Sequence, residues 1–376
     1  MAGQFGIADA KSALVRTTAD GVRLVDLWEE IQQITSIYQV EKDDILALLT
    51  YTTTSAADAI PTSLTPQMME EASEFGVPVA LRPEAPHLVV GYDLKDCDLA
   101  SRMSYRFLRS ATAEQVRAAV TRMIEADRHT IQTRVLHQLF SPATRRNEFG
   151  TTVYPAYNGS GTADNLPPSV RGRTFTASHS HFVPTGSTDL DSEDVELLCK
   201  HVQEHGYGRG GRSGRMVLMF NPDDIEASAM TSWRAGVESD NGKLARFDFI
   251  VSPTAAPYLT NETVVGEKPP AEWEGIPIIG SYGASFVCSS EVVPAGYFAA
   301  VATHGANQPG NAVAFREHEK PEYRGLQFMP GGDVRAYPLS ESFSVRTFGT
   351  GLRRRGAVAV AQLTAGSYTA PTEFAL

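Results

Sequence analysis

The sequence predicts an α+β fold in which helices and strands do not alternate regularly. One long run of helical spacing covers residues 112–139, about 28 residues or roughly 40 Å at the standard helical rise. From about residue 245 onward the chain instead alternates short apolar segments with turns. The elements do not follow the order strand, helix, strand, helix that a doubly wound parallel sheet requires, so we do not expect that class.

The composition is typical of a folded chain of about two or three domains, with 376 residues, 42% hydrophobic and 20% charged. A formal charge of −11 does not suggest the basic face with which proteins grip nucleic-acid phosphates. Cys97, Cys199 and Cys288 are too few and too widely spaced for a disulfide framework or a cysteine-rich zinc site, and the reducing cytoplasm fits best. No apolar run approaches the ~20 residues of a membrane span, and the N-terminus lacks the pattern of a secretory signal.

The N-terminal region is predicted to begin with two helices. An apolar stripe at helical spacing covers residues 24–38, and a shorter helical segment follows at 43–49. Residues 52–66 are rich in threonine, serine and proline and indicate an extended linker. We therefore interpret residues 1–72 as an arm and not as an independent domain.

A strand hairpin is expected next. The segments "VPVALRP" (77–83) and "HLVVGYDL" (87–94) flank a Pro-Glu-Ala-Pro turn, and a further strand, 99–108, follows. Two strands alone are only marginally stable, so this hairpin needs another surface to lie on.

The long helix is expected to start at Thr112, with Gln115 as its capping-box partner. Asp127 and Arg128 interrupt its apolar stripe, which predicts that the helix is not buried along its full length. The remaining chain predicts further elements that include helices at 191–205 and 221–230, a strand at 215–220, and extended segments at 340–348 and 353–363.

One stretch, "CKHVQEHGYGRGG", matches the pattern H-x-x-E-H of some zinc peptidases through His201, Glu204 and His205. The apolar stripe of the same helix, however, lies about 110° from His201 and nearly opposite Glu204. The three side chains therefore point mostly to solvent, and no third ligand is evident. Ordinary surface histidines are the favoured interpretation, and a zinc-dependent hydrolase is kept as an alternative.

Two further histidines, His179 and His181, share one face if they lie on a strand. They could join His201 and His205 in a four-histidine metal site, but a strand packed beside the following helix with satisfied imidazoles is favoured. We predict no metal, no cofactor and no catalysis. The glycine-rich "GYGRGGRSG" follows a helix and precedes a strand, the reverse of a dinucleotide-binding loop.

Several stretches carry a family resemblance: "GYDLKDCDLASR", "VYPAYN", "RTFTASHSHFVPTG", "HVQEHGYG", "FREHEKPEYRGLQFMPG" and "RTFGTGLRRRGAVAVAQL". Together with the order of elements, they resemble the major capsid proteins of tailed double-stranded DNA bacteriophages with the Hong Kong 97-type fold, and among these the proteins of phages that infect actinobacteria. The similarity runs from about residue 70 to the C-terminus.

The resemblance implies a specific division of the chain. Residues 1–72 would be an N-terminal arm, 73–110 the extended loop, 111–169 the peripheral domain with its spine helix, 170–315 the axial domain, and 316–376 the returning peripheral strands. By this resemblance the protein forms hexamers and pentamers of an icosahedral head that encloses double-stranded DNA.

The resemblance also implies partners. Neighbouring capsomers would be contacted through the extended loop and the arm, portal and scaffolding proteins would assist assembly in the host bacterial cytoplasm, and no membrane is involved. The candidate contact residues are two small groups in the loop and near the C-terminus: Arg82, Glu84, His87, Arg353, Arg354 and Arg355.

Two points stay open at this level. An encapsulin-like compartment holding protein cargo has the same fold and is the second interpretation. Some relatives cross-link a loop lysine to an asparagine of a neighbour, but Lys95 is the only lysine near the loop and no partner is identifiable, so non-covalent stabilisation is expected.

Overall fold

The computed structural model describes residues 15–40, 44–61, 87–253, 269–329 and 339–375, with short pieces between 69 and 77. These residues form two compact units. The described residues within Met1–Lys42, Leu94–Gln132 and Glu317–Phe348 form the first, which we name the spine unit. Those within Asp43–Asp93, Thr133–Arg316 and Gly349–Leu376 form the second, the sheet unit.

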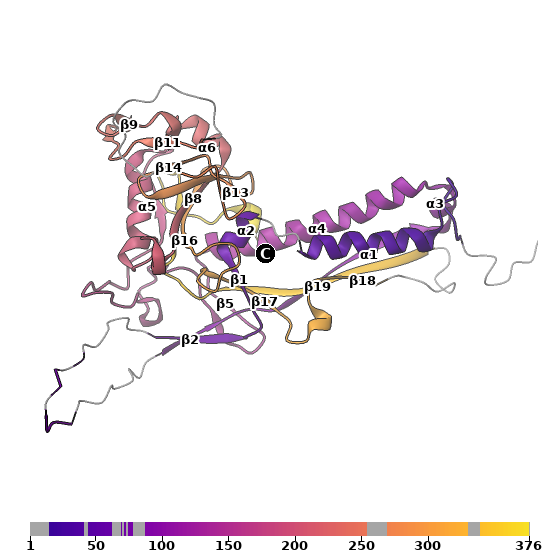
Figure 1. Cartoon of the computed structure of the whole chain (residues 1–376), viewed down its shortest axis with the longest axis horizontal. Helices are drawn as coiled ribbons and strands as arrows, with labels where there is room; N and C mark the ends of the chain where they lie inside the picture. Colours follow the sequence, from indigo (N-terminus) through magenta and orange to yellow (C-terminus); the bar gives the residue numbers. More distant parts are fainter. Residues whose placement is uncertain are drawn as a thin grey trace, which may run out of the picture. The chain divides into compact units, whose positions relative to one another are not determined.

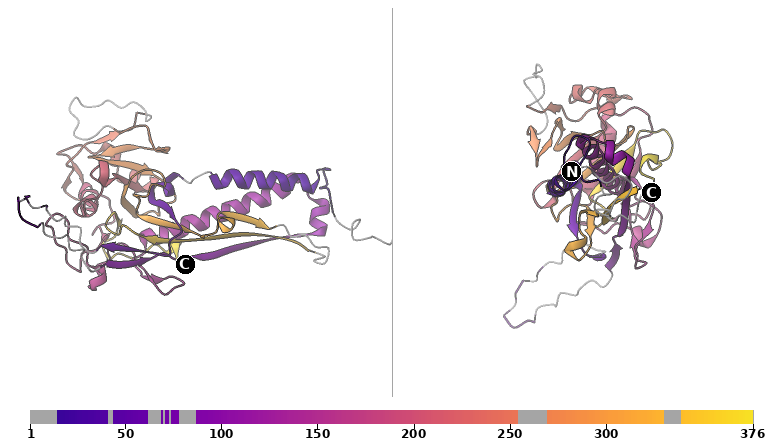
Figure 2. Two further views of the ribbon diagram at one scale, coloured as in Figure 1. Left: turned by 60° about the horizontal axis from the view of Figure 1, so that its bottom comes forward. Right: turned by 90° about the vertical axis from the view of Figure 1, so that its right-hand side faces the viewer.

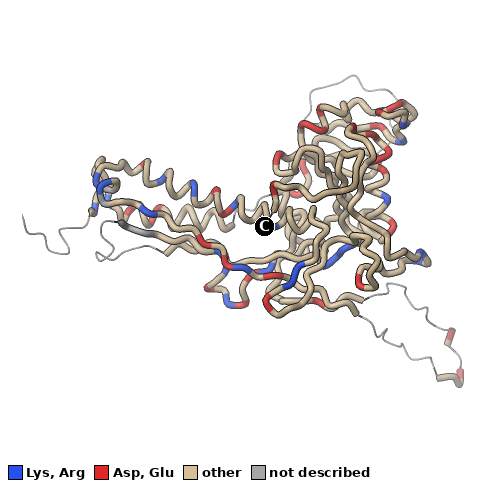
Figure 3. Tube along the Cα trace, turned by 180° about the vertical axis from the view of Figure 1, so that it is seen from behind, with Lys and Arg blue, Asp and Glu red and all other residues tan. Residues whose placement is uncertain are grey.

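The spine unit is built on two helices that lie side by side, α1 (Leu24–Val40) and the first part of α4 (Ala113–Phe140) (Figures 1 and 2). Buried Leu27 of α1 packs against Ala113 and Val116 of α4. Arg117 and Glu30 form a two-pronged ion pair at 2.9 Å on both oxygens. Charges of both signs are interspersed along the two helices (Figure 3).

A three-stranded part of a sheet completes the spine unit. Strand β19 (Leu339–Leu352), whose last four residues belong to the sheet unit, pairs antiparallel with β4 (Lys95–Ser104) and with β18 (Leu326–Met329). Helix α3 (Tyr105–Ser110) follows β4 directly, because the Ser104 side chain accepts the backbone N–H of Phe107 at 3.0 Å and caps the new helix.

The sheet unit has a mixed seven-stranded sheet as its core. The strand order is β11 (Phe249–Val251), β14 (Gly280–Tyr282), β15 (Ser285–Ser289), β8 (Arg215–Phe220), β16 (Tyr297–Thr303), β20 (Val358–Gln362) and β7 (Phe182–Pro184). The central strands are almost continuously apolar because both of their faces are buried. Helix α5 (Ser192–Glu204) packs on β16 and β20 through Val195, Leu198 and Val202.

Shorter elements surround this sheet. Helix α2 (Asp44–Leu49) leads into β1 (Thr50–Thr53), which pairs parallel with β17 (Val313–Glu317). The other short elements are the hairpin of β2 (Ala57–Pro61) and β3 (His87–Gly91), the pairs β5 (Arg145–Arg146) with β6 (Thr152–Val153), β9 (Glu238–Asp240) with β10 (Lys243–Leu244), and β12 (Glu272–Trp273) with β13 (Ile276–Pro277), and helix α6 (Pro222–Ala227). No helix in the described part of the chain is long and apolar enough to cross a membrane.

The predicted helices and the strand at 215–220 are confirmed within a few residues. The expected N-terminal arm over residues 1–72 contacts the rest of the chain in the described part of that range. There α1 packs on α4, β1 pairs with β17, and β2 pairs with β3. The described part of the threonine-rich segment, expected to be a linker, contains strand residues. The partner strands lie far away in the sequence, so local composition cannot indicate the pairing.

The predicted hairpin is described only in part. Strand β3 pairs with β2, and most of the segment at 77–83, its expected partner, lies outside the described residues. The following strand starts at Lys95 and ends at Ser104, where α3 begins. The two units do not coincide with the expected ranges: 73–110, 111–169 and 316–376 are each divided between them.

Candidate functional site

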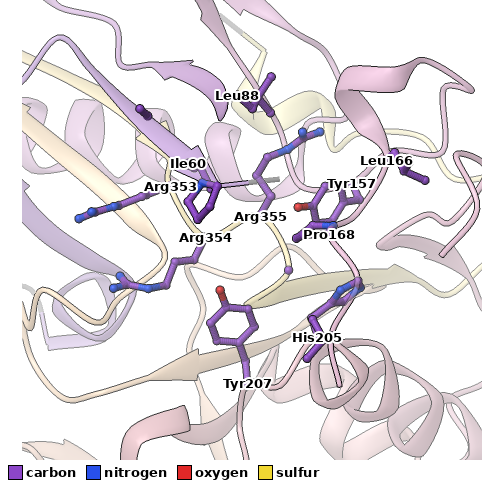
Figure 4. Close-up of a pocket in the computed structure, with 14 residues that line it drawn as sticks. Ile60, Leu88, Tyr157, Leu166, Pro168, His205, Tyr207, Arg353, Arg354 and Arg355 are labelled. Atoms are coloured by element: carbon purple, nitrogen blue, oxygen red, sulfur yellow. The ribbon is translucent and has the colours of Figure 1, made fainter. Parts of the chain in front are cut away.

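The three consecutive arginines 353–355 lie in the turn between β19 and β20 and point in different directions (Figure 4). The Arg355 side chain is directed inward: Nε donates to the Pro155 carbonyl at 2.8 Å and Nη1 to the Asp164 carbonyl at 2.7 Å, and Nη2 bonds Asn165. Its guanidinium also lies 4.4 Å from the ring centre of Tyr157. Only 3% of Arg355 is exposed, and burial lowers the pKa of its guanidinium.

Arg355 therefore holds the 155–165 loop in place, and its prediction as a subunit contact is wrong because the guanidinium is enclosed by its own chain. Arg353 and Arg354 differ from it. Arg353 lies 3.4 Å from the carboxylate of Asp58 with 41% of its side chain exposed. Arg354 donates to the carbonyls of Pro309 and Asn311.

A cavity of about 190 Å³ opens beside the arginines (Figure 4). Its walls come from the hairpin β2–β3, the 157–170 loop, the end of α5 and the arginine turn, and its lining includes Ile60, Leu88, Leu166, Pro168, Val170, His205, Tyr207 and Arg353. This cavity could not be predicted from the sequence, because its four walls are separated by long stretches of chain.

His87 is exposed on β3 next to Leu88, so one residue of the predicted loop group lies at the rim of this hairpin. Arg82 and Glu84 lie outside the described residues. Leu88, the neighbour of His87, lines the same cavity as the arginine turn, although the two are far apart in the sequence.

The histidines form the second feature of this region. The Nε2 atom of His205 lies 2.9 Å from Nε2 of His181 and 3.1 Å from Nε2 of His179. His181 is fully buried and His205 nearly so, and ring contacts to Tyr157 and Phe175 enclose them. Burial lowers the pKa of His181 well below its usual range and that of His205 to about 3, so both imidazoles are neutral at pH 7.

The expectation that these histidines face solvent is therefore wrong for His205. A helical wheel places side chains only while the helix continues, and His205 is the C-cap of α5, where the backbone leaves helical geometry. His201 remains in the helix, and its Nδ1 donates to the Leu197 carbonyl at 3.0 Å. Glu204 forms an ion pair with Arg173 at 2.9 Å. Among the described residues, the close group of ligand atoms is His179, His181 and His205, and not the H-x-x-E-H set.

Comparison with solved structures decides the family. The chain is similar to a structure of Mycobacterium phage Patience, with 33% sequence identity and a TM-score of 0.74, over 99% of this chain and 97% of that chain. The chain belongs to the Hong Kong 97-type major capsid proteins of tailed bacteriophages.

Other solved structures resemble this capsid protein more distantly. The holo-SrpI encapsulin complex from Synechococcus elongatus PCC 7942 has 13% identity and a TM-score of 0.46, over 87% of this chain and 89% of that chain. The capsid of the native GTA particle has 15% identity and a TM-score of 0.45, over 85% and 89%. Likenesses at this level add nothing to the assignment. No protein-family model matches the chain, and no curated protein matches it.

Membership of this family makes the protein a structural component of the phage head. The prediction of a major capsid protein from the quoted sequence stretches is confirmed. In this capsid protein the arginine turn and the histidine group lie in one unit. Both contribute to the wall of the same cavity, the histidine group through His205.

Proposed function

We propose that this capsid protein assembles into hexamers and pentamers of an icosahedral head that encloses double-stranded DNA. The observation that carries the proposal is 33% identity to the Mycobacterium phage chain over nearly the whole length of both. Portal and scaffolding proteins would be its partners in the host cytoplasm. The spine unit would provide most of the peripheral domain and the sheet unit the axial domain.

Surface features of the chain support self-association. In β3, Leu88 and Val90 pack on the buried residues Tyr51 and Tyr92, while Val89 on the opposite face is 50% exposed. Ile34 and Ile37 are likewise exposed on α1. A two-stranded ribbon with an apolar outer face gains stability when a neighbouring subunit covers that face.

The proposed contact residues are Arg82, Glu84, His87, Arg353 and Arg354; buried Arg355 is not among them. Arg353 and Arg354 keep part of their surface exposed beside the hairpin base. We also propose that the shell carries no lysine–asparagine cross-link through Lys95, which is the first residue of β4 and pairs with Phe348. A ladder of multimers that survives boiling in detergent would contradict this part.

A structural role without catalysis is part of the proposal. The Glu204 carboxylate, which a zinc peptidase would use as its general base, is bound to Arg173 instead. Within the described part of the chain, the Glu204–Arg173 ion pair gives no support to a hydrolase over a shell protein. Hydrolysis of a peptide substrate that disappears in Glu204→Gln would overturn this part.

The test is negative-stain electron microscopy of the purified full chain. We expect closed particles, or rings of five or six subunits. A chain that stays monomeric with added scaffolding protein would contradict the proposal. Particles that contain protein cargo and no nuclease-resistant DNA would favour a cargo compartment.

A pair of variants at Val89 makes the assembly test specific. We expect Val89→Asp to block or weaken assembly, because it places a charge on the face that a neighbour covers. Val89→Thr keeps the β-branched shape and should assemble normally. Circular dichroism of both variants checks that the monomer is folded. If the two variants assemble equally well, the hairpin is not part of the interface.

A further inference from the structure

The histidine group has the geometry of a metal site. Its three Nε2 atoms converge, with separations of 2.9 Å and 3.1 Å from the central His205 to the other two. Tetrahedral zinc with bonds of about 2.0–2.1 Å to imidazole nitrogen separates its ligand atoms by about 3.3 Å. All three ligand nitrogens lie within 4.8 Å of one another, so movement of the rings toward a common centre would place one cation at bonding distance from all three.

The hydrogen-bonding pattern supports this arrangement. Nδ1 of His181 donates to the Val358 carbonyl at 2.6 Å, so the proton is on Nδ1 and the lone pair of Nε2 faces His205. Metal-binding histidines usually donate their second ring nitrogen to such a carbonyl, which fixes tautomer and orientation. Nε2 of His205 carries at most one N–H, so without a cation it cannot form a good hydrogen bond with both neighbouring nitrogens. A cation accepts all three lone pairs at once.

The scaffold holds the ligands in place. The backbone of His181 is fixed on both sides, by its N–H to Tyr157 and by its carbonyl to the N–H of Val360. Phe175 stacks on the His205 ring at 4.2 Å, which restricts its rotation. A Cβ at Gly356 would lie 2.9 Å from Cβ of His205, so the glycine is needed for the close approach of the arginine turn.

We propose that His179, His181 and His205 bind one divalent transition metal ion, with Zn²⁺ as the expected ion, and that this ion joins the end of α5 to the segment before β7. Imidazole nitrogens suit Zn²⁺ and related metals, whereas Ca²⁺ and Mg²⁺ prefer oxygen. The role is structural, since the ion closes a long loop of chain within the sheet unit. This departs from the sequence-based expectation of no metal and does not depend on the proposed function.

His201 is the nearest further imidazole in the described region, with ring centres 5.2 Å from His179 and 5.9 Å from His181. The Glu204 carboxylate is the nearest acidic neighbour acting on His179, and its charge favours a cation nearby. Arg173 neutralises part of that charge. The proposal therefore rests on the three converging nitrogens and not on local charge.

The experiment measures zinc in the purified full-length chain by mass spectrometry of metals, after dialysis against zinc-free buffer and again after addition of Zn²⁺ alone. We expect about one zinc per chain in the wild type. His179→Ala should lower zinc affinity at least tenfold, as should His205→Gln. The matched control is His129→Ala, which removes an exposed histidine from α4 and should bind zinc like the wild type.

A second measurement keeps the test decisive if His205→Gln fails to fold. His179 is only partly buried, so His179→Ala is expected to fold, and circular dichroism will confirm this. A chelator should lower the thermal midpoint of the wild type and of His129→Ala, but not that of His179→Ala. Zinc at background level in the wild type, or equal zinc in folded His179→Ala, would overturn the proposal.

Discussion

Asp127 and Arg346 form a buried ion pair in the spine unit, with Nε of the arginine 2.6 Å from Oδ1 of the aspartate. The second carboxylate oxygen accepts the hydroxyl of Tyr38 at 2.9 Å. The three residues come from α4, β19 and α1, so one carboxylate connects all three elements. Burial, together with the neighbouring carboxylate, raises the pKa of Tyr38, which keeps its hydroxyl protonated as a donor.

The first prediction concerns this carboxylate. Asp127→Ala should destabilise the spine unit by about 3–5 kcal/mol, because it leaves the Arg346 charge buried without a partner. The measurement is the denaturant midpoint of the unassembled chain, detected with a spectroscopic probe in the spine unit. The control is Asp26→Ala, which breaks the exposed ion pair with Arg23 and should shift the midpoint far less, because solvent screens that pair. Equal shifts for the two variants would refute the role of the buried pair.

This pair also shows where sequence reasoning stops. The periodicity of α4 could be predicted from local spacing. Asp127 interrupts the apolar stripe, so the sequence indicates exposure at this position, whereas the aspartate is buried. Its partner Arg346 lies 219 positions along the chain, so nothing near the aspartate indicates that it is neutralised. The same holds for β2, whose strand partner is decided by tertiary pairing and not by its own composition.

The candidate site divides in a similar way. The histidine residues could be found from sequence because H-x-x-E-H and S-H-S-H are local patterns. Their convergence could not, because it depends on where α5 ends and on how β7 lies against β20. The arginine triplet could also be found, but only the fold shows that Arg355 turns inward.

The second prediction separates these arginines. Arg355→Lys should destabilise the sheet unit by roughly 2–4 kcal/mol, because an ammonium cannot supply the planar set of donors and leaves buried acceptors unpaired. Arg353→Lys should change stability by less than about 1 kcal/mol, since its ion pair with Asp58 is partly exposed. Thermal midpoints of the two variants test this. If both are equally mild, Arg355 does not hold the 155–165 loop.

The third prediction is a pH dependence centred on His137. Its Nδ1 donates to the Phe374 carbonyl at 2.8 Å, and burial lowers its pKa below the usual value of about 6.5. The charged groups acting on it are Arg145 and Arg134, which lower the pKa, and Asp93, which raises it.

Because the unfolded chain then binds a proton more readily than the folded chain, this histidine contributes stability above pH 6.5 that is lost as the pH falls below it. Denaturation midpoints of the wild type should therefore decline more steeply on acidification than those of His137→Gln, which cannot titrate. Nuclear magnetic resonance titration of the imidazole should give the lowered pKa directly. Parallel pH profiles of the two proteins would rule out the contribution.

The last prediction concerns Gly349 in β19. A Cβ at this position would lie 1.8 Å from the carbonyl oxygen of Asp93 and 2.3 Å from its carbonyl carbon. The Asp93 backbone cannot withdraw, because its N–H donates to the Thr350 carbonyl at 3.2 Å while its side chain accepts the Thr350 N–H at 2.5 Å. Gly349→Ala should therefore destabilise the sheet unit by about 3 kcal/mol or more.

Gly366 provides the matched control for this substitution. A Cβ there would meet only the Thr364 hydroxyl, at the ordinary contact distance of 3.5 Å. Gly366→Ala should leave stability within about 0.5 kcal/mol of the wild type, or raise it slightly by restricting the unfolded chain. Comparison of thermal midpoints and of soluble yield distinguishes the two variants. A Gly349→Ala protein as stable as Gly366→Ala would mean that β19 and Asp93 separate readily, and the close backbone packing between them would then contribute little to the sheet unit.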